Sequence, residues 1–160
     1  MTPSGWHDDA RNRDAGHDEM QIAVFDYLQD KPVLHGMDGY NDRIGLYFES
    51  PFYVRGHIVA WGDIVELWEK PERETWKRRR YIVWEIKPKI YSVGAVIRQC
   101  RSLVDAVEAA NKDSVSHRRA PSSISYDDPI VIPIVQSDDP KLSMLRHVRH
   151  AITWDGERLS

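Results

Sequence analysis

Three charged residues have types and spacing that suit shared chemistry. Glu85 and Lys87 stand two positions apart in the strand-like run 81–87, so both side chains point to the same face of that strand. The residues that alternate with them are apolar and are expected to be buried. Asp63 starts the preceding strand-like run, 63–68. If the two runs pair as a hairpin, the start of the first lies opposite the end of the second, and Asp63 lies close to Glu85.

Two carboxylates on neighbouring strands form a site of hard oxygen atoms, which suits Mg²⁺. Such an ion polarises a phosphoryl oxygen and lowers the pKa of a bound water. Lys87 can orient that water or neutralise charge that develops on the phosphate. The three residues therefore predict metal-assisted hydrolysis of a phosphodiester. The alternative is a plain ion pair between Glu85 and Lys87, which typically stabilises a protein by only about 0–1 kcal/mol.

The apolar periodicity predicts the elements that position these residues. Helical spacing begins at His17 and stops at Lys31-Pro32, and the best helical stripe spans about 92–110. A last helix is expected over about 138–148. Helices and strands in this order predict an α/β domain with a central mixed β-sheet flanked by helices. The expected strands are 44–48, 57–61, 63–68, 81–87, 130–135 and 151–154.

Connections between these elements follow from Pro, Ser and charged residues. A break is expected at Ser50-Pro51, an exposed hairpin connection at 69–80 and a polar loop at 111–129. Residues 1–16 are polar and predict a flexible amino-terminal tail, which leaves 17–160 as a single domain.

Composition excludes several classes of protein. A hydrophobic fraction of 41% in 160 residues is that of one globular domain, and no apolar run has the roughly 20 residues of a membrane span. With no signal peptide visible, a cytoplasmic location is expected. Cys100 is the single cysteine, which excludes an internal disulfide and cysteine-based metal sites. The net charge of −3 lacks the basic excess of proteins that hold DNA by charge alone.

Together, Gly62-Asp63 and Glu85-Ile86-Lys87 resemble the motif of the PD-(D/E)XK nuclease superfamily, whose fold is the restriction-endonuclease-like αβββαβ core. Two further residues match that resemblance. Glu19 lies in the first helix, where many members keep an acidic residue, and Gln99 lies in the helix after the Glu-x-Lys strand. The resemblance covers about residues 17–155, including the order of the elements.

The resemblance implies a role for each matching residue. Asp63 and Glu85 would bind Mg²⁺, for which Mn²⁺ substitutes, with the Ile86 carbonyl as a third ligand. Glu19 would bind a second metal or water, although a first-turn acid is also favoured simply by the helix dipole. Lys87 would assist the attacking water. The products would carry 5′-phosphate and 3′-hydroxyl ends.

Candidate nucleic-acid contacts flank these residues. Gln99 either supports the site or touches the substrate backbone, and Ser92 lies on the same flank of its helix. Arg98 points away from the apolar stripe and is either exposed or reaches DNA. A basic run is either a solvated hairpin tip or a DNA clamp. It consists of Lys77, Arg78, Arg79 and Arg80.

The sequence thus predicts a metal-dependent DNA endonuclease. The alternatives are an exonuclease or a nuclease specific for branched DNA, and a non-catalytic nucleic-acid-binding or assembly module on the same fold. Leu103 stands where RecB-type exonucleases usually have a tyrosine four residues after the glutamine. RNA as substrate and a homodimer both stay open, as do strand type and sequence preference.

Overall fold

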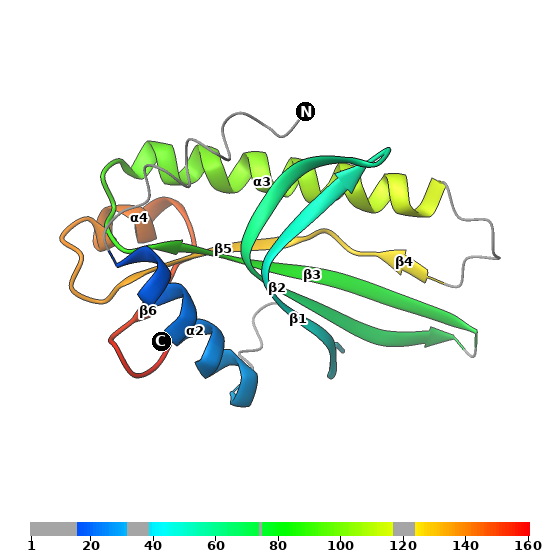
Figure 1. The fold of residues 1–160 in the computed structure, drawn as a ribbon, viewed down its shortest axis with the longest axis horizontal. Helices are drawn as coiled ribbons and strands as arrows, with labels where there is room; N and C mark the ends of the chain where they lie inside the picture. Colours follow the sequence, from blue (N-terminus) through cyan, green and yellow to red (C-terminus); the bar gives the residue numbers. More distant parts are fainter. Residues whose placement is uncertain (1–15, 32–38, 74, 117–123) are drawn as a thin grey trace.

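The computed structural model describes residues 16–31, 39–73, 75–116 and 124–160. These form an α/β fold with a six-stranded mixed sheet, so the expected fold class is confirmed (Figure 1). Most of the expected tail, residues 1–15, lies outside the described residues. No helix of the described part is long and apolar enough to cross a membrane. The elements are α2 (His17–Asp30), β1 (Asp42–Val54), β2 (His57–Arg73), β3 (Trp76–Lys87), α3 (Val93–Ser116), β4 (Ile124–Tyr126), β5 (Ile130–Gln136), α4 (Leu142–Val148) and β6 (Ile152–Trp154).

The sheet has an antiparallel half and a parallel half that meet at β3. Its main path runs β1-β2-β3-β5-β6, and β4 pairs with the first part of β3. β1, β2 and β3 are antiparallel, whereas β4 and β5 run parallel to β3, and β6 runs parallel to β5. The predicted hairpin geometry is confirmed, because Ile64 pairs with Trp84 and the two strands are antiparallel. β3 is therefore the central strand that carries Glu85 and Lys87.

Two hydrophobic layers cover the two faces of the sheet. α2 packs on the face that carries Trp84 and Ile86, both of which are buried. α3 packs on the face that carries Val83, and α4 joins that layer through Leu145 (Figure 1). The alternation expected from the sequence is therefore confirmed: Ile82, Trp84 and Ile86 face α2, and Val83 faces α3.

A buried charged group ties α2 to the sheet. Glu66 is 0% exposed and accepts hydrogen bonds from Trp84 Nε1 at 2.6 Å and from Arg43 Nη1 at 3.0 Å. Arg43 Nη1 also donates to the Leu28 carbonyl, near the end of α2, at 2.6 Å. Burial raises the pKa of the Glu66 carboxyl, and the hydrogen bonds from Arg43 and Trp84 counteract that rise. This network stabilises α2 against the sheet because it satisfies each polar group that it buries.

The hairpin strands are longer than the sequence predicted. The break expected at Ser50-Pro51 is wrong: β1 continues through it, and Pro51 pairs with Trp61. β1 is an edge strand, where a proline that cannot donate is tolerated. The exposed connection expected at 69–80 is also wrong, because β2 extends to Arg73 and β3 begins at Trp76. Cross-strand ion pairs, described below, line these extensions.

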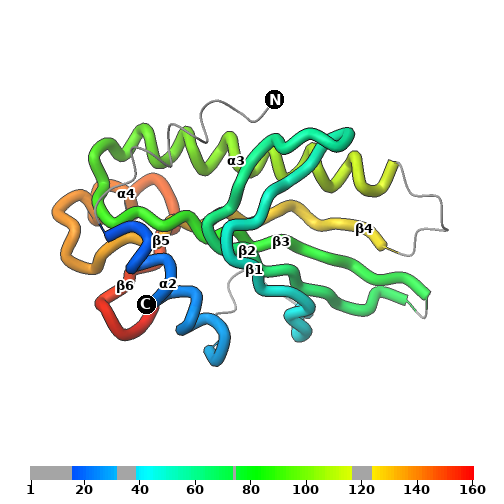
Figure 2. Tube along the Cα trace, in the orientation of Figure 1, coloured from blue at the N-terminus to red at the C-terminus, as the bar shows by residue number. Residues whose placement is uncertain are grey.

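The outer half of the β1–β2 hairpin leaves the sheet and lies across α3 (Figure 2). β2 pairs with β3 only from Ile64 onward, and before that point its partner is β1 alone. The hairpin turns at Arg55-Gly56, where both φ angles are positive, and the Arg55 amide donates to Asp113 of α3 at 3.0 Å. The point where β2 separates from β3, at residues 62–64 of β2 and 85–86 of β3, is named the β2–β3 fork.

Gly62 permits the close packing at the β2–β3 fork. A Cβ atom at this position would lie 2.5 Å from Val65 Cγ2 and 2.9 Å from Val83 Cγ1. Both distances are far below van der Waals contact, and valine side chains have little rotational freedom with which to move aside. A residue without a side chain is therefore required where β2 turns away from β3.

The polar loop expected over 111–129 is only partly a loop. α3 continues to Ser116, and β4 pairs in parallel with Lys77–Arg79, the start of β3. Within the described residues, this segment is held by Asp127, whose carboxylate accepts from Tyr40 at 2.5 Å and from Arg78 at 2.6 Å. Three residues are too few for a strand pattern to be recognised in the sequence, which is why β4 was missed.

Candidate active site

Asp63 lies at the β2–β3 fork, and its side chain bridges the separating strands. The Ile86 amide lies beyond the last paired residues of β2 and β3, and it donates to Asp63 Oδ2 at 2.9 Å. A side-chain carboxylate therefore takes the place of a backbone acceptor at this point. Asp63 is only partly exposed, with 16% of its side-chain surface accessible. The fork thus fixes the position of the Asp63 carboxylate through its Oδ2 atom.

Glu85 and Lys87 are carried by the same stretch of β3. Ile64–Trp84 is the last pair of β2 and β3, and Asp63 and Glu85 are the residues that adjoin it, one on each strand. Glu85 and Lys87 are both half-buried. The structure therefore brings together the three residues that the sequence singled out, at the point where β2 leaves β3.

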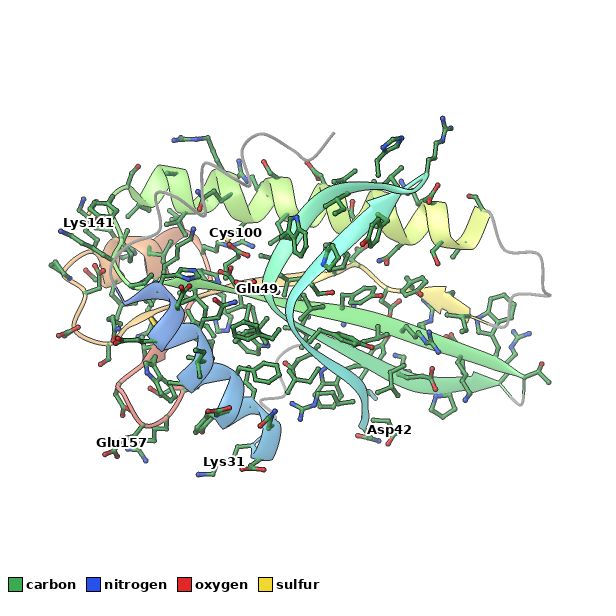
Figure 3. The ribbon with its side chains drawn as sticks, viewed as in Figure 1. Lys31, Asp42, Glu49, Cys100, Lys141 and Glu157 are labelled. Carbon is green, nitrogen blue, oxygen red and sulfur yellow. The ribbon has the colours of Figure 1, made fainter. Side chains whose placement is uncertain are left out.

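α3 contributes Gln99 to this group. The Lys87 ammonium donates a hydrogen bond to Gln99 Oε1, which restrains the long lysine side chain over the strand. Cys100 follows Gln99 in α3 and is fully buried, as expected of a small hydrophobic side chain (Figure 3). Burial raises the pKa of its thiol, and the charges of Arg149, Glu85 and Lys87 are close enough to act on it. Cys100 thus forms part of the packed layer beneath the charged group.

α2 approaches Asp63 with residues that the sequence did not single out. Gln21 Nε2 donates to the Asp63 carbonyl at 2.9 Å, and His17 Nε2 lies 3.4 Å from Asp63 Oδ2. Glu19, expected to bind a second metal or water, is exposed and lies about 200° around the helix from both of them. The signal that identifies His17 and Gln21 is helical phase, because each continues the buried stripe of Val24 and Leu28.

Glu49 lies opposite Asp63 on β1, the strand that neighbours β2 on the side away from β3. The pairs Phe48–Ile64 and Ser50–Gly62 flank it, so the register sets Glu49 against Asp63. Its φ angle of 50° is unusual for a residue with a side chain, and Figure 3 labels it at the bend of the hairpin. The backbone of β1 thus departs from ordinary strand conformation at the same level as the β2–β3 fork. The sequence around residue 49 does not predict this backbone conformation.

The two candidate nucleic-acid contacts on α3 lie at its amino end. Ser92 Oγ accepts from the Ala95 amide at 3.2 Å, so this hydroxyl caps the helix. Arg98 is exposed, one residue before Gln99. Both residues therefore lie on the same part of α3 that holds Lys87.

The basic run of β3 is paired with carboxylates of the same molecule, which offset most of its charge. Arg79 Nε lies 2.8 Å from Glu69 Oε2, and Lys77 Nζ lies 3.2 Å from Glu69 Oε1. Arg78 pairs with Glu72 and with Asp127, and Arg80 lies 3.9 Å from Asp127. The run begins about ten residues before Lys87 on an extended strand, which corresponds to roughly 30 Å. The structure does not bring these four side chains to the β2–β3 fork.

The donor set at the fork fits a divalent cation of the Mg²⁺ type. Asp63 and Glu85 supply carboxylate oxygens, and Gln21 Oε1 is a buried oxygen that receives no hydrogen bond from the described part of the chain. Within that part, no three His, Cys, Asp or Glu side chains gather as a metal-binding group. Mg²⁺ is usually held by one or two carboxylates and keeps several waters, so two carboxylates satisfy its requirement.

Comparison with known proteins finds no match for this chain among protein-family models, curated proteins or solved structures.

Proposed function

We propose that this protein is a Mg²⁺-dependent DNA endonuclease whose active site is the β2–β3 fork. One observation carries the proposal: Asp63, whose carboxylate is fixed by the Ile86 amide, stands at the same level of the sheet as Glu85, and Lys87 follows on the same face. This arrangement of two carboxylates and a lysine at a separating strand pair is the one that the resemblance to PD-(D/E)XK nucleases implies. Mn²⁺ would replace Mg²⁺.

The residues of the fork divide the work of phosphodiester hydrolysis. Asp63 and Glu85 would hold the cation, with the Ile86 carbonyl as an additional ligand. The bound cation supplies positive charge at the phosphate and lowers the pKa of a water. Lys87 orients the attacking water and neutralises charge on the phosphate, and Gln99 keeps the Lys87 ammonium in place. Hydrolysis by this route leaves a 5′-phosphate and a 3′-hydroxyl.

DNA is proposed to reach the fork along the amino end of α3. Arg98 is exposed there and lies next to Gln99, so its guanidinium is placed to contact a phosphate. Ser92, at the start of the same helix, can donate its hydroxyl hydrogen while its oxygen caps the helix. The basic run at Lys77–Arg80 contributes less to this contact, because carboxylates already offset most of its charge.

Cleavage assays test the proposal directly. Plasmid, single-stranded and branched DNA, with an RNA of matched sequence, are incubated with Mg²⁺ or Mn²⁺ and the wild type, Glu85→Gln or Lys87→Ala. We expect the wild type to cleave at least one DNA and both variants to be inactive. Equal cleavage by wild type and Lys87→Ala would refute the active-site assignment.

The same assays separate the alternative functions. Nicking of closed circular plasmid identifies an endonuclease, cleavage only of linear ends identifies an exonuclease, and preference for the branched substrate identifies a structure-specific nuclease. Binding of DNA without cleavage by the wild type would favour a non-catalytic binding module.

A further inference from the structure

Two polar residues of α2 are buried one helical turn apart. Gln21 is 0% exposed and His17 is 8% exposed. Burial of a polar side chain is unfavourable unless each of its polar atoms finds a partner. Both side chains contact Asp63: Gln21 Nε2 donates to its carbonyl, and His17 lies 3.4 Å from its carboxylate. Contacts at the β2–β3 fork, rather than packing in the hydrophobic core, therefore explain why these two polar side chains are buried.

Gln21 retains an acceptor that no described part of the chain satisfies. Its Oε1 atom is buried and receives no hydrogen bond from the described residues. Reversal of the amide group would not remove the problem, because Oε1 would then face the Asp63 carbonyl, which is also an acceptor. The hydrogen bond to the Asp63 carbonyl thus sets the orientation of the Gln21 amide, and Oε1 is the amide atom that remains without a donor among the described residues. A buried acceptor of this kind usually binds a donor, and none of the described residues supplies one.

We infer that Gln21 is a positioning residue of the active site. Its Nε2 holds the Asp63 backbone, and its Oε1 accepts a hydrogen bond from a water that belongs to the cation held by Asp63 and Glu85. The inference rests on the proposed function, since it assumes a cation at the fork. A hydrogen bond of this kind orients the water and makes cation binding tighter. Gln21 then supplies from α2 what the sequence led us to expect from Glu19.

Binding of Mn²⁺, measured by electron paramagnetic resonance in the absence of DNA, tests the inference. The variants are Asp63→Asn, Gln21→Leu and Gln29→Leu. Gln29 is an exposed glutamine on the same helix and provides a matched control. We expect Gln21→Leu to bind Mn²⁺ about tenfold more weakly than wild type, the scale of a lost outer contact. Gln29→Leu should bind as wild type does, and Asp63→Asn should not bind.

The outcomes separate the two ideas. Wild-type affinity in Gln21→Leu, together with loss of binding in Asp63→Asn, would overturn the role of Gln21 and leave the proposed function intact. Absence of Asp63-dependent Mn²⁺ binding in the wild type would overturn both.

A second variant decides the matter if Gln21→Leu does not fold. Gln21→Glu keeps an oxygen at the position of Oε1 and adds a negative charge. The rise in melting temperature on addition of Mn²⁺ should then be larger than in the wild type, because a carboxylate binds the cation or its water more strongly. A purely structural role predicts a lower melting temperature with an unchanged Mn²⁺ response, and that result would overturn the inference.

Discussion

The Asp63 carboxylate accepts a hydrogen bond of 2.9 Å from the backbone amide of Ile86. This contact joins β2 to β3 at the level where their backbone ladder ends. The same side chain therefore has a structural role and, in the proposed function, a role in holding the cation. Substitutions that keep one role and remove the other can separate them.

Asp63→Asn and Asp63→Ala should differ in stability but not in activity. Asn retains an oxygen that accepts from Ile86, whereas Ala leaves that amide without its partner, at a cost of about 1–3 kcal/mol. Either change removes a cation ligand and should lower the cleavage rate by about a thousandfold, the equivalent of several kcal/mol. Urea denaturation and single-turnover cleavage measure the two effects. Equal stability of both variants would contradict the structural role.

Gln99→Leu should weaken catalysis less than Lys87→Ala does. Without Gln99 Oε1, the Lys87 ammonium loses a partner and moves over more orientations, so we expect about a tenfold fall in kcat, equivalent to roughly 1.4 kcal/mol. KM for DNA should change little if Gln99 acts through Lys87. A large rise in KM with unchanged kcat would instead mean that Gln99 binds the substrate backbone.

Gly62→Ala should destabilise the protein by about 1–3 kcal/mol, because the added methyl group overlaps Val65 and Val83. Gly94→Ala in α3 is the matched control. There the new Cβ lies 3.2 Å from the flexible end of Arg98, and alanine favours a helix by roughly 0.5–1 kcal/mol. Thermal unfolding of the two variants should therefore shift in opposite directions. An unchanged melting temperature of Gly62→Ala would contradict the close packing at the fork.

Arg43→Met should destabilise the protein and increase the pH dependence of its stability. Loss of Arg43 leaves Glu66 buried without its cation, which costs about 3–5 kcal/mol near neutral pH. The pKa of Glu66 is already raised by burial, so its contribution is fully present below the unfolded pKa, near 4.3, and is lost as pH rises through the folded pKa. Arg43 lowers that pKa, and its removal raises it further.

As pH rises above the unfolded pKa of about 4.3, the unfolding free energy of Arg43→Met should therefore fall further than that of the wild type. The double variant Arg43→Met/Glu66→Gln removes the titrating group and keeps an acceptor for Trp84. It should lose the added pH dependence, and a double variant as steep as the single one would implicate another group.

Arg98→Ala and Arg79→Ala should distinguish the two candidate DNA contacts. Arg98 is exposed beside Gln99, and its loss should reduce the slope of log affinity against log salt by about 1. Arg79 pairs with Glu69, so its loss should lower stability by up to about 1 kcal/mol and leave the slope nearly unchanged. Fluorescence anisotropy across a salt series measures both. A smaller slope for Arg79→Ala alone would place DNA on the β2–β3 hairpin instead.

Much of the fold could be predicted because its central elements have strong periodicity. Strict alternation in β3 identified which residues share each face of the strand. The errors concern β1 and β2, whose charged ends resemble loops until cross-strand pairs such as Glu69–Arg79 are known. Such pairs depend on register, and register is a long-range property that a local pattern does not contain.

The site divides in the same way. The position of Asp63 beside the stretch of β3 that carries Glu85 and Lys87 could be predicted, because hairpin geometry relates the two strands directly. Helical phase could have placed His17 and Gln21 on the buried face of α2, but their contacts with Asp63 depend on how α2 packs against the sheet. The sequence favoured Glu19 by residue type, whereas helical phase places His17 and Gln21 toward the fork. Residue type and phase must therefore be considered together at the start of a helix.

The contacts of the β2–β3 fork also differ in the length of chain that each one closes. Lys87 and Gln99 are separated by 12 residues, Asp63 and Ile86 by 23, and Gln21 and Asp63 by 42. Longer loops cost more entropy to close, and contacts distant in sequence form more slowly. During folding, the hairpin and α3 can thus meet before α2 docks. In the proposed function, cleavage activity is then expected to return last on refolding, after most of the secondary structure has formed.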